Sequence, residues 1–164
     1  MLTAKKYRLH FVICWVAVAF LNGCGGPSDP QDALAKANET NLQRLSNLYL
    51  AYQTANNWIG PADEAKFKGF LKTLTPEKLT RIGIDPASID QIFVSERDGK
   101  PFTIRYSVVG NMMGSREPVV FEAEGVDGQR MVGFLDMTVR GVGSEEYDLL
   151  LAGKGPIEKA PARQ

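Results

Sequence analysis

Three carboxylates close together in the second half of the chain have the residue types for acid–base or metal chemistry. Glu122 and Glu124 alternate along a predicted strand, so both lie on one face, and Asp127 follows in the next turn. Paired carboxylates act in general acid–base catalysis and bind calcium. The alternative, which the pattern favours, is the solvent-facing side of a half-buried strand with Phe121 and Ala123 inward. Calcium needs about six to eight oxygen ligands, and no loop supplies a dense run of them, so we expect no metal site.

A glycine-flanked segment, residues 110–116, is a second candidate, with the sequence Gly-Asn-Met-Met-Gly-Ser-Arg. A phosphate-binding loop needs a lysine after its second glycine and then a helix, whereas a predicted strand follows here. Met112 and Met113 instead indicate a soft contact with a partner at a loop tip, because thioether side chains adapt to varied surfaces. The alternative, which the composition favours, is a plain hairpin connection.

Aromatic residues near the end of a long predicted helix are a third candidate. Tyr49 and Tyr52 lie at helical spacing, and Trp58 follows just beyond. They could line a groove for a ligand or a partner. Aromatic residues at helical spacing are more typical of a core that packs on a sheet, and the pattern favours that alternative. Trp58, just beyond the helix, stays a candidate interaction residue, together with Met112 and Met113 of the glycine-flanked segment.

The amino-terminal segment has the pattern of a secretory signal peptide. Lys5, Lys6 and Arg8 make a positive start, the first 23 residues contain no acidic residue, and residues 11–21 are all apolar. A membrane-spanning helix needs about 20 apolar residues to cross ~30 Å of hydrocarbon. The apolar run is shorter than that, so we predict a cleaved signal over residues 1–23.

The apolar run ends in Leu21-Asn22-Gly23-Cys24, which resembles the lipobox of bacterial lipoproteins. The apolar, small and cysteine positions match, and Asn22 departs from the pattern. The resemblance implies cleavage between Gly23 and Cys24 and lipidation of the Cys24 thiol, with palmitate-type acyl chains that hold a protein stably on a membrane when there are two or more. The alternative is a plain secretory cleavage after the small-x-small residues 17–19.

Removal of residues 1–23 limits the chemistry that the rest of the chain can do. It takes away three of the 19 basic residues and none of the 19 acidic ones, leaving a net charge of −3. We therefore expect no nucleic-acid partner. It also takes away His10 and Cys14, which excludes Ser-His-Asp and Cys-His catalysis, disulfides and Cys/His zinc sites. We predict a protein that is not an enzyme and has no cofactor.

The remaining chain predicts a single α+β domain over residues 31–152. A Gly- and Pro-rich tether over residues 24–30 precedes it, and a disordered tail over residues 153–164 follows. Residues 31–57 lack Gly and Pro and carry apolar residues at helical intervals, which predicts a long amphipathic helix. Its solvated face is predicted to carry polar side chains that include Asn38 and Gln53.

Shorter elements follow this helix. Asp63-Glu64, Thr75-Pro76 and Asp85-Pro86 are typical of helix starts and predict three short helices. Apolar, β-branched runs at residues 92–94, 102–108, 119–123 and 130–139 predict an antiparallel meander of about four strands, with tight turns at Asp98-Gly99 and Asp127-Gly128. A last short helix is predicted over residues 144–151.

A helix followed by an antiparallel sheet resembles type IV pilin-like and type II secretion pseudopilin-like proteins. Residues 97–106 resemble the Asp-x-x-Gly-x-Pro-aromatic start of a pseudopilin strand, with a shorter spacing from Asp98 to Gly99. Residues 132–139 resemble a Phe-Ala-Asp-Gly-His-Val strand of pilin-like proteins of the planctomycete type, with Met137 and Thr138 at the Gly and His positions. Prepilins keep their apolar helix, whereas cleavage before Cys24 removes it. The resemblance therefore implies a pilin-like fold on a lipid anchor, and not a filament subunit.

Together these features predict a lipid-anchored, periplasm-facing protein of the cell membrane or outer membrane. Its expected role is that of a non-enzymatic structural or protein-interaction module with a partner protein in the envelope. The alternative is a periplasmic ligand- or peptide-binding module associated with a transport or secretion system. A carboxylate-only enzyme such as a glycosidase needs two carboxyl groups about 5–9.5 Å apart across a substrate, and the spacing singles out no such pair.

Overall fold

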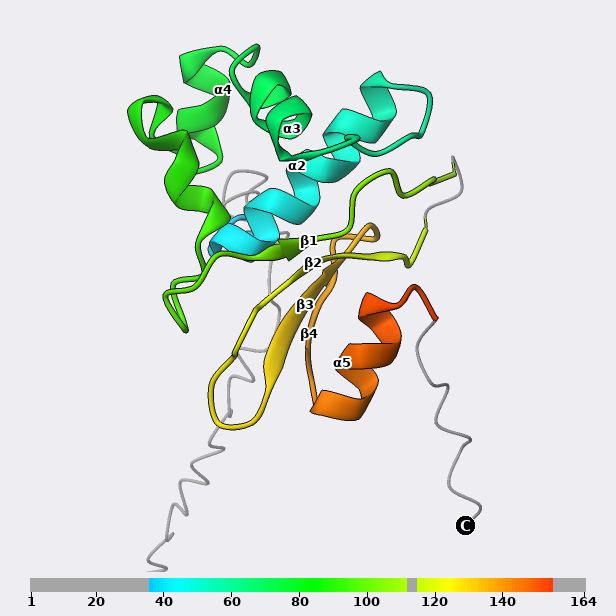
Figure 1. The fold of residues 1–164 in the computed structure, drawn as a ribbon. Helices are drawn as coiled ribbons and strands as arrows, with labels where there is room; N and C mark the ends of the chain where they lie inside the picture. Colours follow the sequence, from blue (N-terminus) through cyan, green and yellow to red (C-terminus); the bar gives the residue numbers. More distant parts are fainter. Residues whose placement is uncertain (1–35, 112–114, 155–164) are drawn as a thin grey trace, which may run out of the picture.

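A computed structural model describes residues 36–111 and 115–154, which form an α+β domain (Figure 1). Its elements in chain order are α2 (Asn41–Ala55), α3 (Glu64–Leu71), α4 (Pro76–Arg81), the 3₁₀ helix η1 (Pro86–Phe93), β1 (Thr103–Ile104), β2 (Pro118–Phe121), β3 (Arg130–Phe134), β4 (Val139–Val142) and α5 (Ser144–Leu151). The strands form one antiparallel sheet in the order β1-β2-β3-β4. The predicted α+β class and four-stranded meander are confirmed. Within these ranges no helix has the length and hydropathy to span a membrane.

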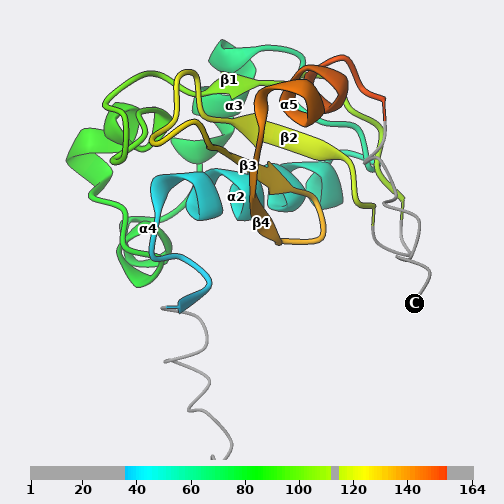
Figure 2. The same cartoon turned by 90° about the horizontal axis from the view of Figure 1, so that it is seen from below.

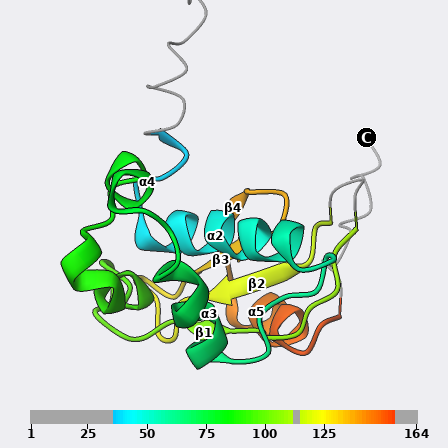
Figure 3. The ribbon, with the colours of Figure 1, turned by 90° about the horizontal axis from the view of Figure 1, so that it is seen from above.

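The sheet lies between two layers of helices. Figure 2 shows α2 on one face of the sheet and α5 on the other, and Figure 3 shows α2 and α3 in front of the sheet when seen from the helix side. Every residue of β2 is buried, because β2 is an inner strand that is covered on both faces. The larger core cluster lies between α2, α3, α4, η1 and the sheet. The smaller one joins the sheet to α5 and consists of Phe121, Val132, Phe134, Val142, Tyr147 and Leu150.

The helix α2 lies close to β3 because Gly133 has no side chain. A Cβ atom at Gly133 would overlap Ser46 Oγ and would lie 2.8 Å from Leu42 Cδ2. Ser46 is itself buried and donates to the Leu42 carbonyl oxygen at 2.9 Å. A glycine facing a serine thus brings the helix near the sheet, since neither residue holds the two backbones apart.

Within the described residues the long predicted helix begins at Asn41, after a turn over residues 37–40. Thr40 ends that turn with a capping box: Thr40 Oγ1 accepts from Gln43 N at 3.2 Å, and Gln43 Oε1 accepts from Thr40 N at 3.0 Å. The helix therefore does not run unbroken through residues 37–40. The predicted stretch over residues 31–35 lies outside the described residues.

The predicted solvated face of this helix is wrong at two positions. Gln53 is fully buried and donates through Nε2 to the Val108 carbonyl oxygen at 2.8 Å. Asn38 is also buried, and its Oδ1 accepts from Asn47 Nδ2 at 3.1 Å. Gln53 is in the interior because the segment around Val108 covers it, and its one hydrogen bond offsets only part of the cost of removing the amide from water, since Gln53 Oε1 has no partner among the described residues. Asn38 lies in the turn before α2 and not on the helix itself.

The predicted starts of the short helices are confirmed. Asp63 caps α3 by accepting from Lys66 N at 2.7 Å, Thr75 caps α4, and Asp85 caps η1 by accepting from Ala87 N at 2.9 Å. Proline occupies the first turn of α4 and of η1, where its missing N–H leaves no helical hydrogen bond unmade. The predicted last helix is α5.

Two of the predicted strands are wrong in detail. Residues 92–94 are no strand, because η1 continues to Phe93 and only Val94 forms a single bridge, to Pro101. The run over residues 130–139 divides into β3 and the start of β4. A turn separates them, in which Met137 has φ +65° and Asp136 Oδ1 accepts from Thr138 N at 3.0 Å.

The two Asp-Gly turns are confirmed. Asp127 and Gly128 both have positive φ, +54° and +74°, as the hairpin turn between β2 and β3 requires. Gly99 has φ +68° in the turn between Val94 and Pro101. The strand predicted over residues 102–108 is shorter than expected, because β1 ends at Ile104 before the chain reaches Ser107, whose φ is +55°.

Candidate functional site

A cavity of about 280 Å³ lies between the first turn of α2, the loop after η1 and the sheet. Its lining combines apolar residues, Leu42, Phe102, Met131 and Val139, with polar and charged ones, Thr40, Gln43, Ser95, Glu96, Arg97 and Glu122. Pockets for drug-sized ligands measure about 300–1,000 Å³. The cavity therefore has the size for a small molecule or for one or two side chains of a partner.

Glu122 is the buried carboxylate of this cavity, with 1% of its surface exposed. Ser95 Oγ donates to Oε1 at 3.0 Å, while Arg97 Nη1 and Met131 N donate to Oε2 at 2.8 and 2.7 Å. A buried charge is tolerated when it is paired and hydrogen-bonded in this way. The carboxylate thus joins β3 and the loop over residues 95–97 to the residue that follows β2.

The predicted pairing of Glu122 with Glu124 on one solvent-facing side is wrong. Glu122 is buried because α5 and α2 cover both faces of the sheet near it, and its carbonyl oxygen accepts from Tyr147 Oη of α5 at 2.8 Å. Glu124 lies beyond the end of β2, where the chain bends, and its exposed side chain is 3.4 Å from Lys100 Nζ. Asp127 is exposed at the hairpin tip. The three carboxylates form no common site.

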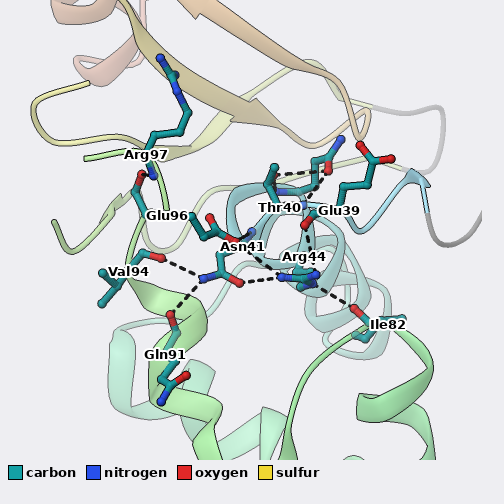
Figure 4. A network of polar contacts seen from close by, with 11 residues as sticks. Glu39, Thr40, Asn41, Arg44, Ile82, Gln91, Val94, Glu96 and Arg97 are labelled. Carbon is teal, nitrogen blue, oxygen red and sulfur yellow. Dashed lines mark hydrogen bonds and ion pairs between the residues drawn. The ribbon is translucent and has the colours of Figure 1, made fainter. Parts of the chain in front are cut away.

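One rim of the cavity is the first turn of α2, which hydrogen bonds hold to the end of η1 (Figure 4). Glu96 Oε1 accepts from Asn41 N at 2.8 Å. Asn41 Nδ2 donates to the carbonyl oxygens of Gln91 and Val94, at 3.1 and 3.0 Å. Because Asn41 bonds to both η1 and the following loop, these segments hold the helix start in a fixed position beside the cavity.

Arg44 extends the same network from the next turn of α2 (Figure 4). Its Nε donates to the Ile82 carbonyl oxygen at 3.1 Å, Nη1 to Asn41 Oδ1 at 2.8 Å, and Nη2 to the Glu39 carbonyl oxygen at 3.1 Å. Arg44 Nη1 also lies 3.6 Å from Glu96 Oε1. Glu96 therefore has both a cation and a backbone N–H as partners.

Arg97 lines the cavity, and its guanidinium group has N–H donors that do not bond to Glu122. Its side chain is 38% exposed, and Nη1 is the guanidinium nitrogen that binds Glu122. In the part of the chain that the structure describes, Nε and Nη2 of Arg97 donate to no other residue. A guanidinium has five N–H donors in a planar fork, so this one can still bind an acceptor.

The candidate interaction residue Trp58 lies away from this cavity, just beyond the C-terminal end of α2. Asn57 and Trp58 have φ values of +54° and +65°, which non-glycine residues rarely adopt. Ile59 follows, 51% exposed, and forms a bridge with Val109, which is 69% exposed. The half-buried Trp58 therefore lies next to a small exposed apolar pair, which the sequence did not predict because the bridge joins distant segments.

The aromatic residues before Trp58 belong to the core, as the favoured alternative predicted. Tyr49 is fully buried, and both Tyr49 and Tyr52 pack edge-to-face on Phe67, with ring centroids 5.8 and 6.4 Å apart. Tyr49 Oη donates to the Arg105 carbonyl oxygen at 2.8 Å and accepts from Val108 N at 3.2 Å. Burial raises the pKa of Tyr49 to about 12.

Met112 and Met113, and likewise Gly23 and Cys24 of the lipobox-like segment, lie outside the described residues. Among the residues that the structure does describe, no three or more His, Cys, Asp or Glu side chains form a group that could hold a metal ion.

Of the charged cavity residues only Glu122 was a candidate from the sequence. Glu96 and Arg97 were not, although Ser95-Glu96-Arg97-Asp98 is a polar run between two apolar segments. No family model, curated protein or solved structure matches this chain.

Proposed function

We propose that this protein is a lipid-anchored, non-enzymatic interaction module on the periplasmic side of a bacterial cell membrane or outer membrane. The observation that carries the proposal is Leu21-Asn22-Gly23-Cys24 at the end of an apolar run, directly before a Gly- and Pro-rich tether. Diacylation of Cys24 would hold the domain on the bilayer, since two acyl chains anchor a protein stably.

The surroundings of the carboxylates support a role without catalysis. Glu122 accepts three hydrogen bonds from the protein itself, and Glu124 and Asp127 lie elsewhere. After residue 23 the chain contains no histidine and no cysteine besides Cys24. Binding is therefore the activity that these residues support best.

The element order supports a pilin-like arrangement as part of this proposal. A helix, α2, comes before an antiparallel meander and packs on one face of it. Asp98 of the pseudopilin-like segment accepts from the backbone N–H groups of Lys100, Glu124 and Gly125 at 3.0, 3.0 and 2.8 Å. In the proposed fold this aspartate joins the turn before β1 to the β2–β3 hairpin.

A second candidate function is that of a ligand- or peptide-binding module associated with a transport or secretion system. The cavity beside the first turn of α2 favours it, because it combines apolar walls with a guanidinium that has unused donors. The exposed Ile59 and Val109 next to Trp58 favour the first candidate, since exposed apolar side chains that lie together are typical of protein contacts.

Labelled-palmitate incorporation and membrane fractionation in a bacterial host test the anchor. The wild type is expected to take up label and to fractionate with membranes, and Cys24→Ala to lose both. Cys14→Ala is the matched control, because it removes the other cysteine, within the predicted signal, and is expected to behave as the wild type. A wild type without label that is soluble in the periplasm would refute the lipid anchor and support a plain secretory cleavage.

A further inference from the structure

The outer edge of β4 has backbone groups that point away from the sheet. The strand order places β4 at one end of the sheet, with β1 at the other (Figure 3). Phe134 N donates to the Thr138 carbonyl oxygen at 3.0 Å, which fixes the hydrogen-bonded positions of the β3–β4 hairpin. In an antiparallel pair such positions alternate with positions that make no bond across the pair. Val139 and Gly141 are at the unbonded positions, so their N–H and C=O groups point away from β3.

This edge is unpaired within residues 36–111 and 115–154. There β4 pairs with β3 alone, and no isolated bridge includes a residue of β4. Proline and bulges are two devices by which natural sheets prevent pairing at an edge. The β4 sequence Val-Arg-Gly-Val has no proline, and it pairs with β3 without a register shift. The edge can therefore accept a further strand.

The cavity beside α2 reaches the same edge, because Val139 lines it. Gly141 shares the sheet face of Val139, since it lies two residues further along the strand. An added strand that bonds to both residues places the side chains opposite them on that face. At Gly141 the face is filled, with Gln129 Oε1 2.9 Å from the position of a Cβ atom. Beside Val139 the cavity of about 280 Å³ can take one apolar side chain, against Leu42 and Met131.

Charge separates the strand of another protein from a second copy of this chain. In an antiparallel pair of two β4 strands, the register that pairs Val139 with Gly141 of the other copy places the two Arg140 residues directly opposite each other. Like charges in this position destabilise a strand pair. Arg140 is 46% exposed on the α5 side of the sheet, where it lies 3.1 Å from Glu146. A strand with an acidic or neutral residue opposite Arg140 meets no such repulsion.

We propose that β4 binds an extended peptide segment of a partner protein, which adds a fifth strand to the sheet and places an apolar side chain in the cavity beside α2. Main-chain hydrogen bonds to Val139 and Gly141 supply affinity, and the cavity selects the side chain, as is general for binding by strand addition. The residue opposite Arg140 is acidic or neutral. The inference rests on the second candidate function and names the conformation and side-chain pattern of its peptide ligand.

Amide hydrogen exchange of the purified protein, followed by NMR, tests the edge directly. In the free protein the amides of Val139 and Gly141 are expected to exchange quickly and those of Arg140 and Val142 slowly, because only the latter bond to β3. The probe is the peptide acetyl-Ser-Leu-Thr-Leu-Ser-amide, whose leucines lie on one face of a strand. Saturation with this peptide is expected to slow exchange at Val139 and Gly141 at least about tenfold and to leave the other two amides unchanged.

N-methylated peptides separate strand pairing from general adhesion. A methyl group on one leucine nitrogen removes an N–H that faces β4, whereas a methyl group on the threonine nitrogen removes one that faces away. The first change is expected to weaken binding about tenfold, and the second to alter it little. Replacement of both leucines by alanine is expected to weaken binding at least about fivefold, because less apolar surface is buried in the cavity.

A protein variant separates the cavity from the backbone edge. Val139→Phe fills the cavity but keeps the outward N–H and C=O groups, so it is expected to remove the preference for leucine over alanine. The matched control is Val126→Phe, since Val126 is 37% exposed in the β2–β3 hairpin and does not line the cavity. The control is expected to bind each peptide as the wild type does.

The wild-type measurements decide the proposal even if a variant fails to fold. Slow exchange at Val139 and Gly141 in the free protein, or equal binding of the two N-methylated peptides, would overturn it. Protection that rises with protein concentration in the absence of peptide would overturn it in favour of a second copy.

The methyl group of Met131, which lines the cavity, distinguishes failure of the inference from failure of the function on which it rests. A shift of this methyl group by the leucine peptide without protection of β4 would overturn strand addition and leave the second candidate function standing. Neither a shift nor protection would overturn both. These results do not depend on palmitate incorporation, so they are also distinguishable from failure of the lipid anchor.

Discussion

Replacing Gly133 by alanine tests the close packing of α2 on β3. The new Cβ atom would overlap Ser46 Oγ, and it would lie 2.8 Å from Leu42 Cδ2 and 3.3 Å from Ser46 Cβ. Ser46 cannot rotate away without losing its hydrogen bond to the Leu42 carbonyl oxygen. Overpacking of this kind costs about 1–3 kcal/mol. We expect the free energy of unfolding to fall by that amount.

Urea denaturation followed by far-ultraviolet circular dichroism measures the change. Gly69→Ala is the control, because Gly69 lies exposed within α3 and a Cβ atom there meets no heavy atom within 4 Å. The control is expected to be as stable as the wild type or up to about 1 kcal/mol more stable, since alanine is the better helix former. Ser46→Ala removes the overlapping oxygen, so in a double-mutant cycle it is expected to recover about 1 kcal/mol of the cost of Gly133→Ala. A Gly133→Ala variant as stable as the wild type, with no coupling to Ser46, would refute the contact between α2 and β3.

Three further substitutions test the polar contacts of the interior. Glu122→Gln retains the size of the side chain but cannot accept from all three donors, so it is expected to lower the unfolding free energy by about 2–3 kcal/mol. The exposed Glu124→Gln is the control. Equal stability of the two variants in urea would contradict the role of Glu122 as a buried acceptor that joins β3 to the loop over residues 95–97. Burial would raise the pKa of Asp98, but hydrogen bonds from the backbone N–H groups of residues 125, 100 and 124 lower it overall. The ionised Asp98 therefore stabilises the folded state above about pH 3.8, the ordinary pKa, and this stabilisation is lost as the pH falls below that value. Acid denaturation is therefore expected to be shallower in Asp98→Asn, and an unchanged acid profile would count against this. Tyr49→Phe leaves a buried N–H and a buried carbonyl without their partner and is expected to cost about 1–3 kcal/mol. Because the folded pKa of about 12 exceeds the ordinary 10.0, the wild type is expected to lose stability as the pH rises from 10 toward 12, and the variant to lose less in an alkaline titration.

Local signals predicted much of the fold. The aspartate and threonine caps at residues 63, 75 and 85 act within three residues along the chain, so the sequence alone identifies α3, α4 and η1. The Asp127-Gly128 turn is equally local, because both residues tolerate positive φ. These rules fail where the local signal is missing: Met137 makes the turn between β3 and β4 with φ +65°, and nothing in its type marks a turn.

Contacts between distant segments account for the remaining errors. The alternation rule placed Glu122 in solvent because it assumes one wet face of the sheet, whereas both faces are covered. Phe121 packs on Tyr147 of α5, and the Glu122 side chain lies beside α2 and the loop over residues 95–97. Gln53 was placed outside for a similar reason, since the segment around Val108 covers it. The cavity was not predicted, because Ser95 and Arg97 meet Glu122 across more than 20 residues of chain.

The helix α2 is synthesised well before the strands that cover it. About 60 residues separate Ala55 from Pro118, where β2 begins. At synthesis rates of about 5–20 residues per second, this corresponds to a delay of about 3–12 s. During that interval Leu42, Leu45 and Tyr49 lack their partners on the sheet, so a nascent chain exposes a hydrophobic helix face that a chaperone can recognise until β2 and β3 emerge.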